Sequence, residues 1–358
     1  MNQQPYDEMH NSILYIGSHI PKTRKYVGSG ETIANNLSDR GWSIILSSRK
    51  EKKLPRLLDM MWTIFSRRNA YHIAIVDVFS GLSFYWAYAS GLLLRILKIP
   101  FILVLRGGAL PEFSQSHKKI ITSLFTWASK VISPSAYLRE KLFVFRDDIE
   151  LIPNGLAINK YFYSERRSSL NQLIWLRAFH KIYNPSLLPD VIDALISDGH
   201  NLSCTMIGPD RGDGSLQDVQ QKIDSRKLNQ YIEVILGIDK IEVPDYLSKA
   251  DIFINTTNVD NTPVSVIEAM ACGLCVVSTN VGGIPYLLED GVDALLVPPN
   301  DPAAMAQAVK RILTDPQLAN RLSSNARRKA ESFSWEKVLP MWERLINDVL
   351  EQNETQKK

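Results

Sequence analysis

The stretch from Asp251 to Ser278 constrains the fold most, because two short apolar runs flank a helical segment there. Asp251–Asn255 and Cys275–Ser278 are mostly apolar, as buried parallel strands are. Between them, Val264–Ala271 carries apolar residues at helical spacing, and Gly273 is suited to end the helix. A strand, helix and strand in this order predict a parallel sheet covered by helices.

The N-terminus of that helix is a candidate anion site. Pro263 favours the first helical position, and Thr262 is the expected N-cap. The first amides and the positive end of the helix dipole suit a phosphate or diphosphate. Asp260 and Glu268 flank this point, and carboxylates suit the hydroxyls of a sugar and a ribose. An Asp that only complements the dipole and a Glu in solvent remain equally open alternatives.

Short apolar runs and longer amphipathic segments alternate through the rest of the chain, which predicts an α/β fold of two doubly wound parallel sheets. In such sheets, ligands bind at the carboxyl ends of the strands. The expected strands of the first half are 13–17, 43–46, 73–77, 101–105, 130–133 and 149–152. Those of the second half are 173–176, 203–207, 233–236, 251–255, 275–278 and 295–297.

Charge is divided unevenly along the chain. Residues 1–160 contain 21 Lys and Arg against 12 Asp and Glu, a net charge of +9; because the whole chain carries +3, residues 161–358 carry −6. The basic half predicts an anionic partner, and since no nucleic-acid motif accompanies the charge, nucleic acid is not expected. An anionic membrane surface or a lipid-diphosphate acceptor is expected instead. The candidate residues are Lys22, Arg24, Lys25, Lys50, Lys52, Lys53, Arg67 and Arg68.

The expected setting is the cytoplasm, because residues 1–10 are polar and acidic rather than a signal peptide, and three cysteines cannot all pair. Peripheral attachment to the inner face of the plasma membrane is left open. The charge-free run 78–94 is interrupted beyond its end by Arg95 and Lys98. It is therefore expected to form a buried helix rather than a membrane span.

Three motifs resemble one known family. Glu268-Ala-Met-Ala-Cys-Gly273, with Asp260 before it, resembles the nucleotide-sugar signature of family 4 of the retaining glycosyltransferases, the glycosyl transferases group 1. Val281-Gly-Gly-Ile-Pro285 and Leu151-Ile-Pro-Asn-Gly155 resemble two further motifs of the family. Asp260 stands where the family usually has Glu.

The resemblance implies the GT-B fold, in which two Rossmann-like domains face each other across a cleft. It is close over residues 173–300 and diffuse over 13–160. The expected domains are an acceptor-side domain over residues 1–165 and a nucleotide-sugar domain over 166–334. The last segment, 335–358, is expected to form a helix that crosses back onto the first domain.

A nucleoside diphosphate leaving group needs positive charge. Arg177 and Lys181 follow the first strand of the second half, where the family has an Arg and, five positions later, a Lys; the spacing here is four. A forked Arg and a point-charge Lys suit a diphosphate, whereas a solvated loop is the alternative. The chain contains no Asp-x-Asp, so neither a metal nor a cofactor is expected.

The first half offers weaker candidates. Gly28 and Gly30 resemble the family's small-residue loop at the donor phosphate, but lack the third glycine of a dinucleotide fingerprint. Arg106 follows the expected strand 101–105, where the family frequently has His. Because arginine stays protonated, Arg106 cannot be a base and is expected to serve the acceptor side or the developing phosphate charge. A purely structural Arg106 is the alternative, and Asp77 is either a site residue or a cap.

The activity that the resemblance implies is retaining transfer of a hexose-type sugar from a nucleoside diphosphate sugar to a hydroxyl acceptor, in surface polysaccharide or glycolipid assembly. The implied partners are the nucleotide sugar and a sugar or lipid-linked acceptor. A nucleotide-sugar epimerase on the same fold and a non-catalytic nucleotide-binding scaffold subunit are the alternatives. The expected catalytic residues are Arg177, Lys181, Asp260 and Arg106, and the expected substrate-binding residues are Gly28, Gly30, Asn261, Thr262, Pro263, Val264, Ser265 and Glu268.

Overall fold

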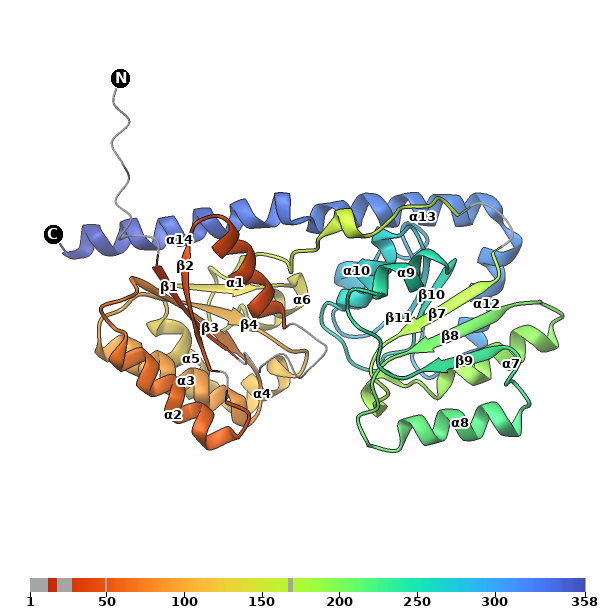
Figure 1. Cartoon of the computed structure of the whole chain (residues 1–358), viewed down its shortest axis with the longest axis horizontal. Helices are drawn as coiled ribbons and strands as arrows, with labels where there is room; N and C mark the ends of the chain where they lie inside the picture. The colour runs from red at the N-terminus through yellow and green to blue at the C-terminus, as the bar shows by residue number, and fades with distance from the viewer. Residues whose placement is uncertain (1–11, 18–27, 49, 167–169, 358) are drawn as a thin grey trace, which may run out of the picture. The chain divides into compact units, whose positions relative to one another are not determined.

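The computed structural model describes residues 12–17, 28–48, 50–166 and 170–357. The chain forms two compact units, each built around its own sheet (Figure 1). Unit 1 contains the described residues up to Gly155 and again from Trp335 on, and unit 2 runs from Leu156 to Ser334. The predicted α/β class with two doubly wound parallel sheets is confirmed.

Unit 1 has a six-stranded parallel sheet in the order β2-β1-β3-β4-β5-β6. All five residues of β4 are buried, because helices cover both faces of the sheet. Growth of the sheet reverses after β2, so β1 and β3 meet at the topological switch point. The strands are β1 (Ser12–Ile16), β2 (Ser43–Ser47), β3 (Ile73–Val78), β4 (Phe101–Leu105), β5 (Lys130–Ser133) and β6 (Glu150–Leu151).

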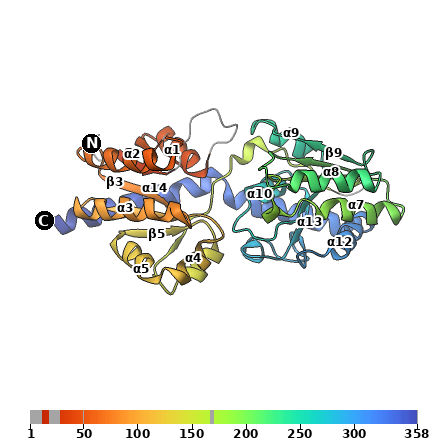
Figure 2. The same cartoon turned by 90° about the horizontal axis from the view of Figure 1, so that it is seen from below.

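The helices of unit 1 form two layers. The elements α2, α3 and α5 pack side by side on one face of the sheet, and α1 packs against α14 on the other (Figures 1 and 2). The helices are α1 (Ser29–Asp39), α2 (Lys53–Ser66), α3 (Leu82–Ile96), α4 (Leu110–Ser116), α5 (Lys118–Trp127), α6 (Ala136–Leu142) and α14 (Trp335–Lys357).

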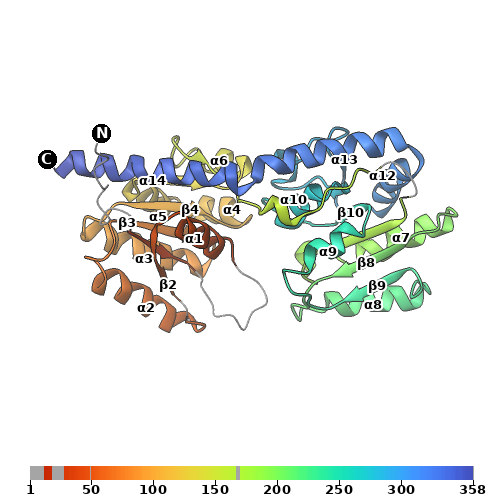
Figure 3. The ribbon, with the colours of Figure 1, turned by 45° about the horizontal axis from the view of Figure 1, so that its top comes forward.

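The helix α14 completes unit 1 although it follows unit 2 in the sequence (Figure 3). Its inner face is buried, with Val338, Trp342 and Ile346 each at most 1% exposed. The ring of Trp335 lies so close to Gly155 that a Cβ there would approach a ring carbon to 2.5 Å. Glycine at 155 therefore lets the chain leave unit 1 directly beneath the start of its last helix.

The helix α3 is only half buried, contrary to the expected buried helix. Phe84 and Leu94 face the core, whereas Leu82, Tyr85 and Ile96 are exposed. Hydrophobic periodicity could not predict the exposed side of α3, because its outward positions are as apolar as its inward ones. No helix in the described ranges is long and apolar enough to cross a membrane.

Unit 2 has a second six-stranded parallel sheet, in the order β12-β11-β10-β7-β8-β9. Its switch point lies between β7 and β10. The strands are β7 (Gln172–Leu176), β8 (Ser203–Ile207), β9 (Ile232–Ile235), β10 (Ile252–Asn255), β11 (Cys275–Thr279) and β12 (Leu295–Val297). The helices are α7 (Leu187–Ser197), α8 (Ser215–Ser225), α9 (Val243–Ser248), α10 (Val264–Ala271), α11 (Ile284–Leu287), α12 (Pro302–Thr314) and α13 (Pro316–Ala330), with short 3-10 turns at η1 (Ile158–Lys160), η2 (Lys181–Tyr183) and η3 (Glu331–Phe333).

The first junction between the units falls at Gly155, before the boundary expected at residue 165. Leu156 and Tyr161 explain the difference, because both are buried in the core of unit 2 together with Phe253 and Val266. Two apolar residues, Leu156 and Tyr161, are a weak sign of a domain core when charged and polar residues follow them. Those charged residues are typical of a linker, and they place the expected boundary too late in the chain.

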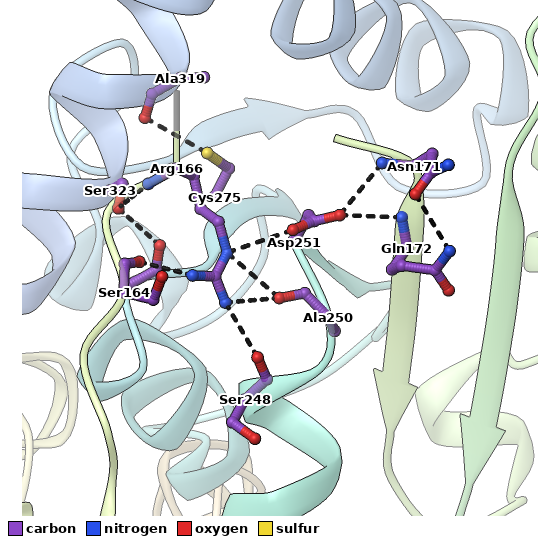
Figure 4. Close-up of polar contacts among 11 residues, drawn as sticks. Ser164, Arg166, Asn171, Gln172, Ser248, Ala250, Asp251, Cys275, Ala319 and Ser323 are labelled. Carbon is purple, nitrogen blue, oxygen red and sulfur yellow. Dashed lines mark hydrogen bonds and ion pairs between the residues drawn. The ribbon is translucent and has the colours of Figure 1, made fainter. Parts of the chain in front are cut away.

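Arg166 anchors the chain shortly before the first strand of unit 2 (Figure 4). Its guanidinium donates to the carbonyl oxygens of Ser164 and Ala250, each at 2.6 Å, and lies 3.4 Å from Asp251 Oδ1. Asp251 Oδ2 accepts from the amide of Gln172 at 3.1 Å. Since Gln172 begins β7 and Asp251 precedes β10, this network ties together the amino-terminal edge of the sheet, opposite the edge where ligands bind.

Candidate functional site

The candidate site lies at the carboxyl ends of β7 and β10, on either side of the switch point. The loops that follow these strands are joined by hydrogen bonds. The amide of Asn258 donates to the carbonyl oxygen of Ile182 at 2.8 Å, and the hydroxyl of Thr256 donates to that of Tyr183 at 2.7 Å. Each loop carries a predicted site residue, so the pairing brings the two together.

Arg177, directly after β7, forms an ion pair with Asp260, which lies in the loop after β10. The two side chains are 14% and 11% exposed. The guanidinium also lies over the ring of Tyr183, 4.1 Å from its centroid. Within the described residues, Arg177 Nε is buried and has no hydrogen-bond partner. A buried donor of this kind is costly unless a ligand accepts from it.

Burial disfavours the charged guanidinium and lowers the pKa of Arg177, while Tyr183 and the charge of Glu268 act in the opposite direction. Arginine nevertheless stays protonated throughout the physiological range. The effect of burial is thus to strengthen the attraction of Arg177 for any anion that reaches it, because the surroundings screen the charge less than water does.

Two glycines fix the backbone at Asp260. A Cβ on Gly283 would lie 1.9 Å from the carbonyl oxygen of Asn261, and one on Gly282 would lie 2.3 Å from that of Asp260. The amide of Gly283 donates to the Asp260 carbonyl oxygen at 2.9 Å. The motif Val281–Pro285 therefore works as a support for the Asp260–Asn261 backbone, since no larger side chain fits there.

The helix α10 begins one residue later than expected. Pro263 occupies the N-cap position with an extended ψ of 115°, and no side chain caps the helix, so the expected Thr262 N-cap is wrong. The first amides, including those of Val264 and Ser265, have no partner inside the helix. In the described part of the chain, the buried hydroxyl of Ser265 has no hydrogen-bond partner either. The expected anion site at this N-terminus thus has unsatisfied polar groups.

Lys181 lies in the same loop as Arg177, with an exposed side chain. Its amide donates to Asp213 Oδ2 at 2.8 Å. Hydrogen bonds from Ser215 and then from this amide lower the pKa of Asp213 to about 2. Asp213 thus stays ionised and holds the loop, while the Lys181 amine adds an exposed positive charge to the loop that carries Arg177. His180 accepts from the amide of Ile182 through Nδ1 and caps the turn.

Glu268 is 1% exposed, so the alternative of a Glu in solvent is wrong. The hydroxyl of Tyr161 donates to Glu268 Oε1 at 2.7 Å, and Lys240 forms an ion pair with the same oxygen. Burial, and then the charge of Glu268, raise the pKa of Tyr161. Tyr161 and Lys240 escaped sequence analysis because they lie 107 and 28 positions away from Glu268. No periodicity or motif connects positions so far apart.

Unit 1 has its own polar cluster at the carboxyl ends of β3 and β4. Arg106 Nε donates to Asp77 Oδ1 at 3.0 Å, Nη1 to Asn154 Oδ1 at 2.8 Å, and Nη2 to the hydroxyl of Tyr15 at 3.2 Å. Burial opposes the charge, but Asp77 and the hydrogen bonds outweigh it and raise the pKa of Arg106. Asp77 is therefore an ion-pair partner, not a cap. An acceptor-side role for Arg106 stays a prediction.

Gly30 packs against this cluster. A Cβ at Gly30 would lie 2.7 Å from Asp77 Oδ2, so glycine here lets α1 approach the cluster. Gly28 is exposed at the N-cap of α1. Their predicted contact with donor phosphate stays a prediction. Lys22, Arg24 and Lys25 lie outside the described residues.

A cavity of about 260 Å³ lies beside Asp77. It is lined by Arg56 and Met60 of α2, by Ser83 and Trp86 of α3, and by residues at the carboxyl ends of β1 and β3. The guanidinium of Arg56 is 5.2 Å from the centre of the Trp86 ring. Among residues that the structure describes, no group of three or more His, Cys, Asp or Glu has the arrangement of a metal site.

Comparison with known proteins places the sequence features in context. The model of the family described as glycosyl transferases group 1 matches residues 162–329. A D-inositol 3-phosphate glycosyltransferase of Streptomyces bingchenggensis is 36% identical over 97 residues, which are 27% of this chain and 21% of that protein. The other D-inositol 3-phosphate glycosyltransferases compared are likewise matched over less than half of their length. An uncharacterized glycosyltransferase of Methanocaldococcus jannaschii is 25% identical over 76% of this chain and 77% of its own.

Solved structures share the fold over nearly all of the chain. The sucrose-phosphate synthase of Thermosynechococcus elongatus aligns with a TM-score of 0.76 at 16% identity, over 96% of this chain and 100% of that one. The Anabaena protein HepE, in complex with UDP and glucose, aligns with a TM-score of 0.72 at 17% identity, over 94% and 99% of the two chains. The fold class is therefore that of the GT-B glycosyltransferases.

Proposed function

Because residues 162–329 belong to the glycosyl transferases group 1 family, we propose that this chain is a retaining glycosyltransferase. It moves a sugar from a nucleoside diphosphate sugar to a hydroxyl acceptor during assembly of a surface polysaccharide or glycolipid. A sugar or lipid-linked acceptor and a cytoplasmic setting are part of the same proposal. The observation that carries it is the ion pair of Arg177 with Asp260, which brings this guanidinium to the loop that leads into the uncapped N-terminus of α10.

The donor diphosphate is assigned to this meeting point. Arg177 Nε and the Ser265 hydroxyl are buried without partners among the described residues. The first amides of α10 point out of the N-terminal end of the helix, as in other anion sites of this kind. Lys181 adds a second cation to the Arg177 loop. Asp260 orients Arg177 through their ion pair and accepts from hydroxyls of the donor sugar. Charge neutralisation by arginine, lysine and amides makes a divalent metal unnecessary in this proposal.

Glu268 is assigned to the ribose of the nucleotide. Its two known contacts, from Tyr161 and Lys240, both use Oε1. They hold the carboxylate in place and leave Oε2 to accept from ribose hydroxyls. Lys240 also offsets the cost of burying a carboxylate near the negatively charged diphosphate.

The proposed reaction needs no protein base. The bond between C1 of the donor sugar and the phosphate oxygen breaks, and the acceptor oxygen bonds to C1 on the same face. The acceptor proton passes to the departing phosphate oxygen. Arg177, Lys181 and the α10 amides stabilise the charge that develops on that phosphate.

Ligand-induced stabilisation tests the donor site. Thermal unfolding is measured with UDP, GDP and ADP, beginning with UDP because it is bound in the Anabaena structure. One of these nucleotides should raise the unfolding temperature of the wild type, since it binds the folded state only. Arg177→Ala should abolish the shift, and Arg226→Ala, in a more exposed ion pair of the same unit, should keep it. If no nucleotide stabilises the wild type, the proposed donor site is contradicted.

Product analysis distinguishes a retaining glycosyltransferase from an epimerase and from a non-catalytic scaffold. The chain is incubated with UDP-glucose and related donors, and the released or transferred sugar is followed by NMR. The proposal expects the anomeric configuration of the donor to be retained; inversion contradicts it. Accumulation of an epimer without acceptor would indicate an epimerase, whereas nucleotide binding without turnover across donors and acceptors would indicate a scaffold.

A further inference from the structure

The outward face of α2 is apolar rather than charged. Leu54, Leu58 and Trp62 are 66%, 61% and 67% exposed, and Phe65 is 49% exposed. Their spacing of four, four and three positions places them in one stripe along the helix. The opposite stripe, Met60 and Ile64 among others, packs on the sheet. A helix on the surface of a globular protein normally has charged residues on its outer face, so this stripe is unusual.

The neighbouring α3 repeats the pattern. Leu82, Tyr85, Leu92 and Ile96 are 66%, 45%, 40% and 66% exposed and follow a second helical stripe. The two helices pack side by side on one face of unit 1 (Figure 2). We call the two stripes together the α2–α3 face. Exposed apolar stripes on two neighbouring helices indicate an interaction site.

Basic residues surround the α2–α3 face. Lys50 and Lys52 precede α2 and Lys53 begins it, Arg67 and Arg68 follow it, Arg95 lies in the last turn of α3 and Lys98 follows that helix; all of these positions are exposed. The guanidinium of Arg68 lies 4.8 Å from the centre of the Phe65 ring, at the edge of the face. The acidic residues of segments 50–68 and 82–98 are Glu51 and Asp59 alone.

We propose that the α2–α3 face docks unit 1 on an anionic lipid bilayer, with the apolar stripes in the headgroup layer and the basic fringe on the phosphates. Leu, Trp and Phe along one face with Lys and Arg at its borders are what an interfacial helix requires. A second copy of the chain fits less well, since a symmetric contact would bring two positive fringes together. This proposal stands apart from sugar transfer and does not depend on it.

The position of the face within the unit is consistent with a membrane-bound substrate. The cavity beside Asp77 is lined in part by α2 and α3, through Met60 and Trp86, and in part by the carboxyl ends of β1 and β3. A lipid-linked molecule held by the bilayer would therefore meet unit 1 next to the carboxyl edge of its sheet, where ligands of doubly wound folds bind.

Vesicle flotation of the full chain tests the proposal. The vesicles contain phosphatidylcholine with or without phosphatidylglycerol. The wild type should float with the anionic vesicles, and less strongly as salt rises. Leu58→Ser with Trp62→Ser should lower the partition coefficient at least tenfold. Phe143→Ser with Val144→Ser is the matched control, since these residues are 55% and 77% exposed at the end of α6, and it should float like the wild type.

Two further variants address charge and depth. Lys52→Gln with Lys53→Gln should weaken binding to anionic vesicles roughly thirtyfold at low salt, since each lysine near such a surface contributes about a factor of five. Trp62→Phe keeps the face apolar and should float normally, but brominated lipid should quench its tryptophan fluorescence less than that of the wild type. All six positions that these variants change are exposed, so the core should stay intact, and circular dichroism checks the fold.

Three outcomes would overturn the proposal. The wild type does not float with anionic vesicles, or the Leu58 and Trp62 variant floats as well as the control, or brominated lipid quenches Trp62→Phe as strongly as the wild type. If sedimentation shows a wild-type dimer that the Leu58 and Trp62 variant lacks while vesicles are not bound, the face is a contact between copies instead.

Discussion

Each unit pairs an arginine that follows a strand with an aspartate from the neighbouring strand or its loop, yet the two pairs differ in what surrounds them. In unit 1, Arg106 uses Nε, Nη1 and Nη2 on three different acceptors and is 5% exposed. In unit 2, Arg177 pairs with Asp260 and stacks on Tyr183, and its Nε is buried without a partner in the described ranges.

The difference indicates separate roles for two similar pairs. A guanidinium whose three nitrogens each donate to an acceptor of the protein gains little from a ligand and holds its own unit together. A guanidinium with an unsatisfied buried donor, beside an uncapped helix, gains when an anion binds. We therefore expect changes at the first pair to act on stability and changes at the second pair to act on binding.

The largest expected effect is on the stability of unit 1. Asp77→Asn leaves the buried Arg106 charge without its counter-ion and should lower the free energy of unfolding by about 3–5 kcal/mol. Urea unfolding followed by tryptophan fluorescence measures it, since every tryptophan except Trp175 lies in unit 1. Glu150→Gln, in a more exposed pair with Lys130, should cost less than about 1 kcal/mol. Equal costs for the two variants would contradict the closed-network interpretation.

The second effect is on nucleotide affinity. Arg177→Ala should weaken UDP binding by about 1.5–3 kcal/mol, or roughly 10- to 150-fold, because it removes charge-assisted hydrogen bonds to the diphosphate. Calorimetry measures the dissociation constant. Arg177→Lys should recover only part of the affinity, since the compact ammonium of lysine does not replace the planar guanidinium, which can donate two parallel hydrogen bonds. Full recovery by lysine would show that the charge, not the orientation of Nε, matters.

Glu268→Gln should weaken UDP binding by about tenfold, at the low end of the range for a charged acceptor. Glutamine keeps an oxygen for Tyr161 and the ribose but loses the charge. The same calorimetric titration applies, with Glu233→Gln on the exposed side of β9 as the control. Unchanged affinity would restrict Glu268 to holding Tyr161 and Lys240 in place.

Arg106→Ala offers the sharpest way to break the comparison. In the fraction that folds, we expect kcat/KM for transfer to fall less than about threefold, roughly 0.7 kcal/mol, and UDP affinity to stay unchanged. A fall of tenfold or more with unchanged UDP affinity would return Arg106 to the acceptor-side role predicted from its position.

The smallest expected effect is that of chelation. Because Arg177, Lys181 and helix amides neutralise the diphosphate, transfer measured with and without EDTA should proceed at the same rate. Complete loss that Mg²⁺ or Mn²⁺ restores would contradict a site built from these cations alone.

The sequence predicts both sheets and names Arg177 and Asp260 as residues of one site, although not their ion pair, because the signals for these features are local. Buried parallel strands such as Phe101–Leu105 are continuous apolar runs, and residues that follow neighbouring strands gather at one edge. The partners of Glu268 escaped because distant chain segments supply them. Thr262 was misassigned because capping depends on a backbone angle, the extended ψ at Pro263, that no residue type determines. The α2–α3 face was missed because both stripes of each helix are apolar.

The placement of α14 has a consequence for how the chain is made. During synthesis, residues 156–334 leave the ribosome before α14 does, so unit 2 can fold as a continuous segment while unit 1 waits for its last helix. Until Trp342 and Ile346 arrive, the apolar surface that they cover beside α1 stays open to water and to other chains. Unit 1 therefore begins to be synthesised before unit 2 but is completed after it.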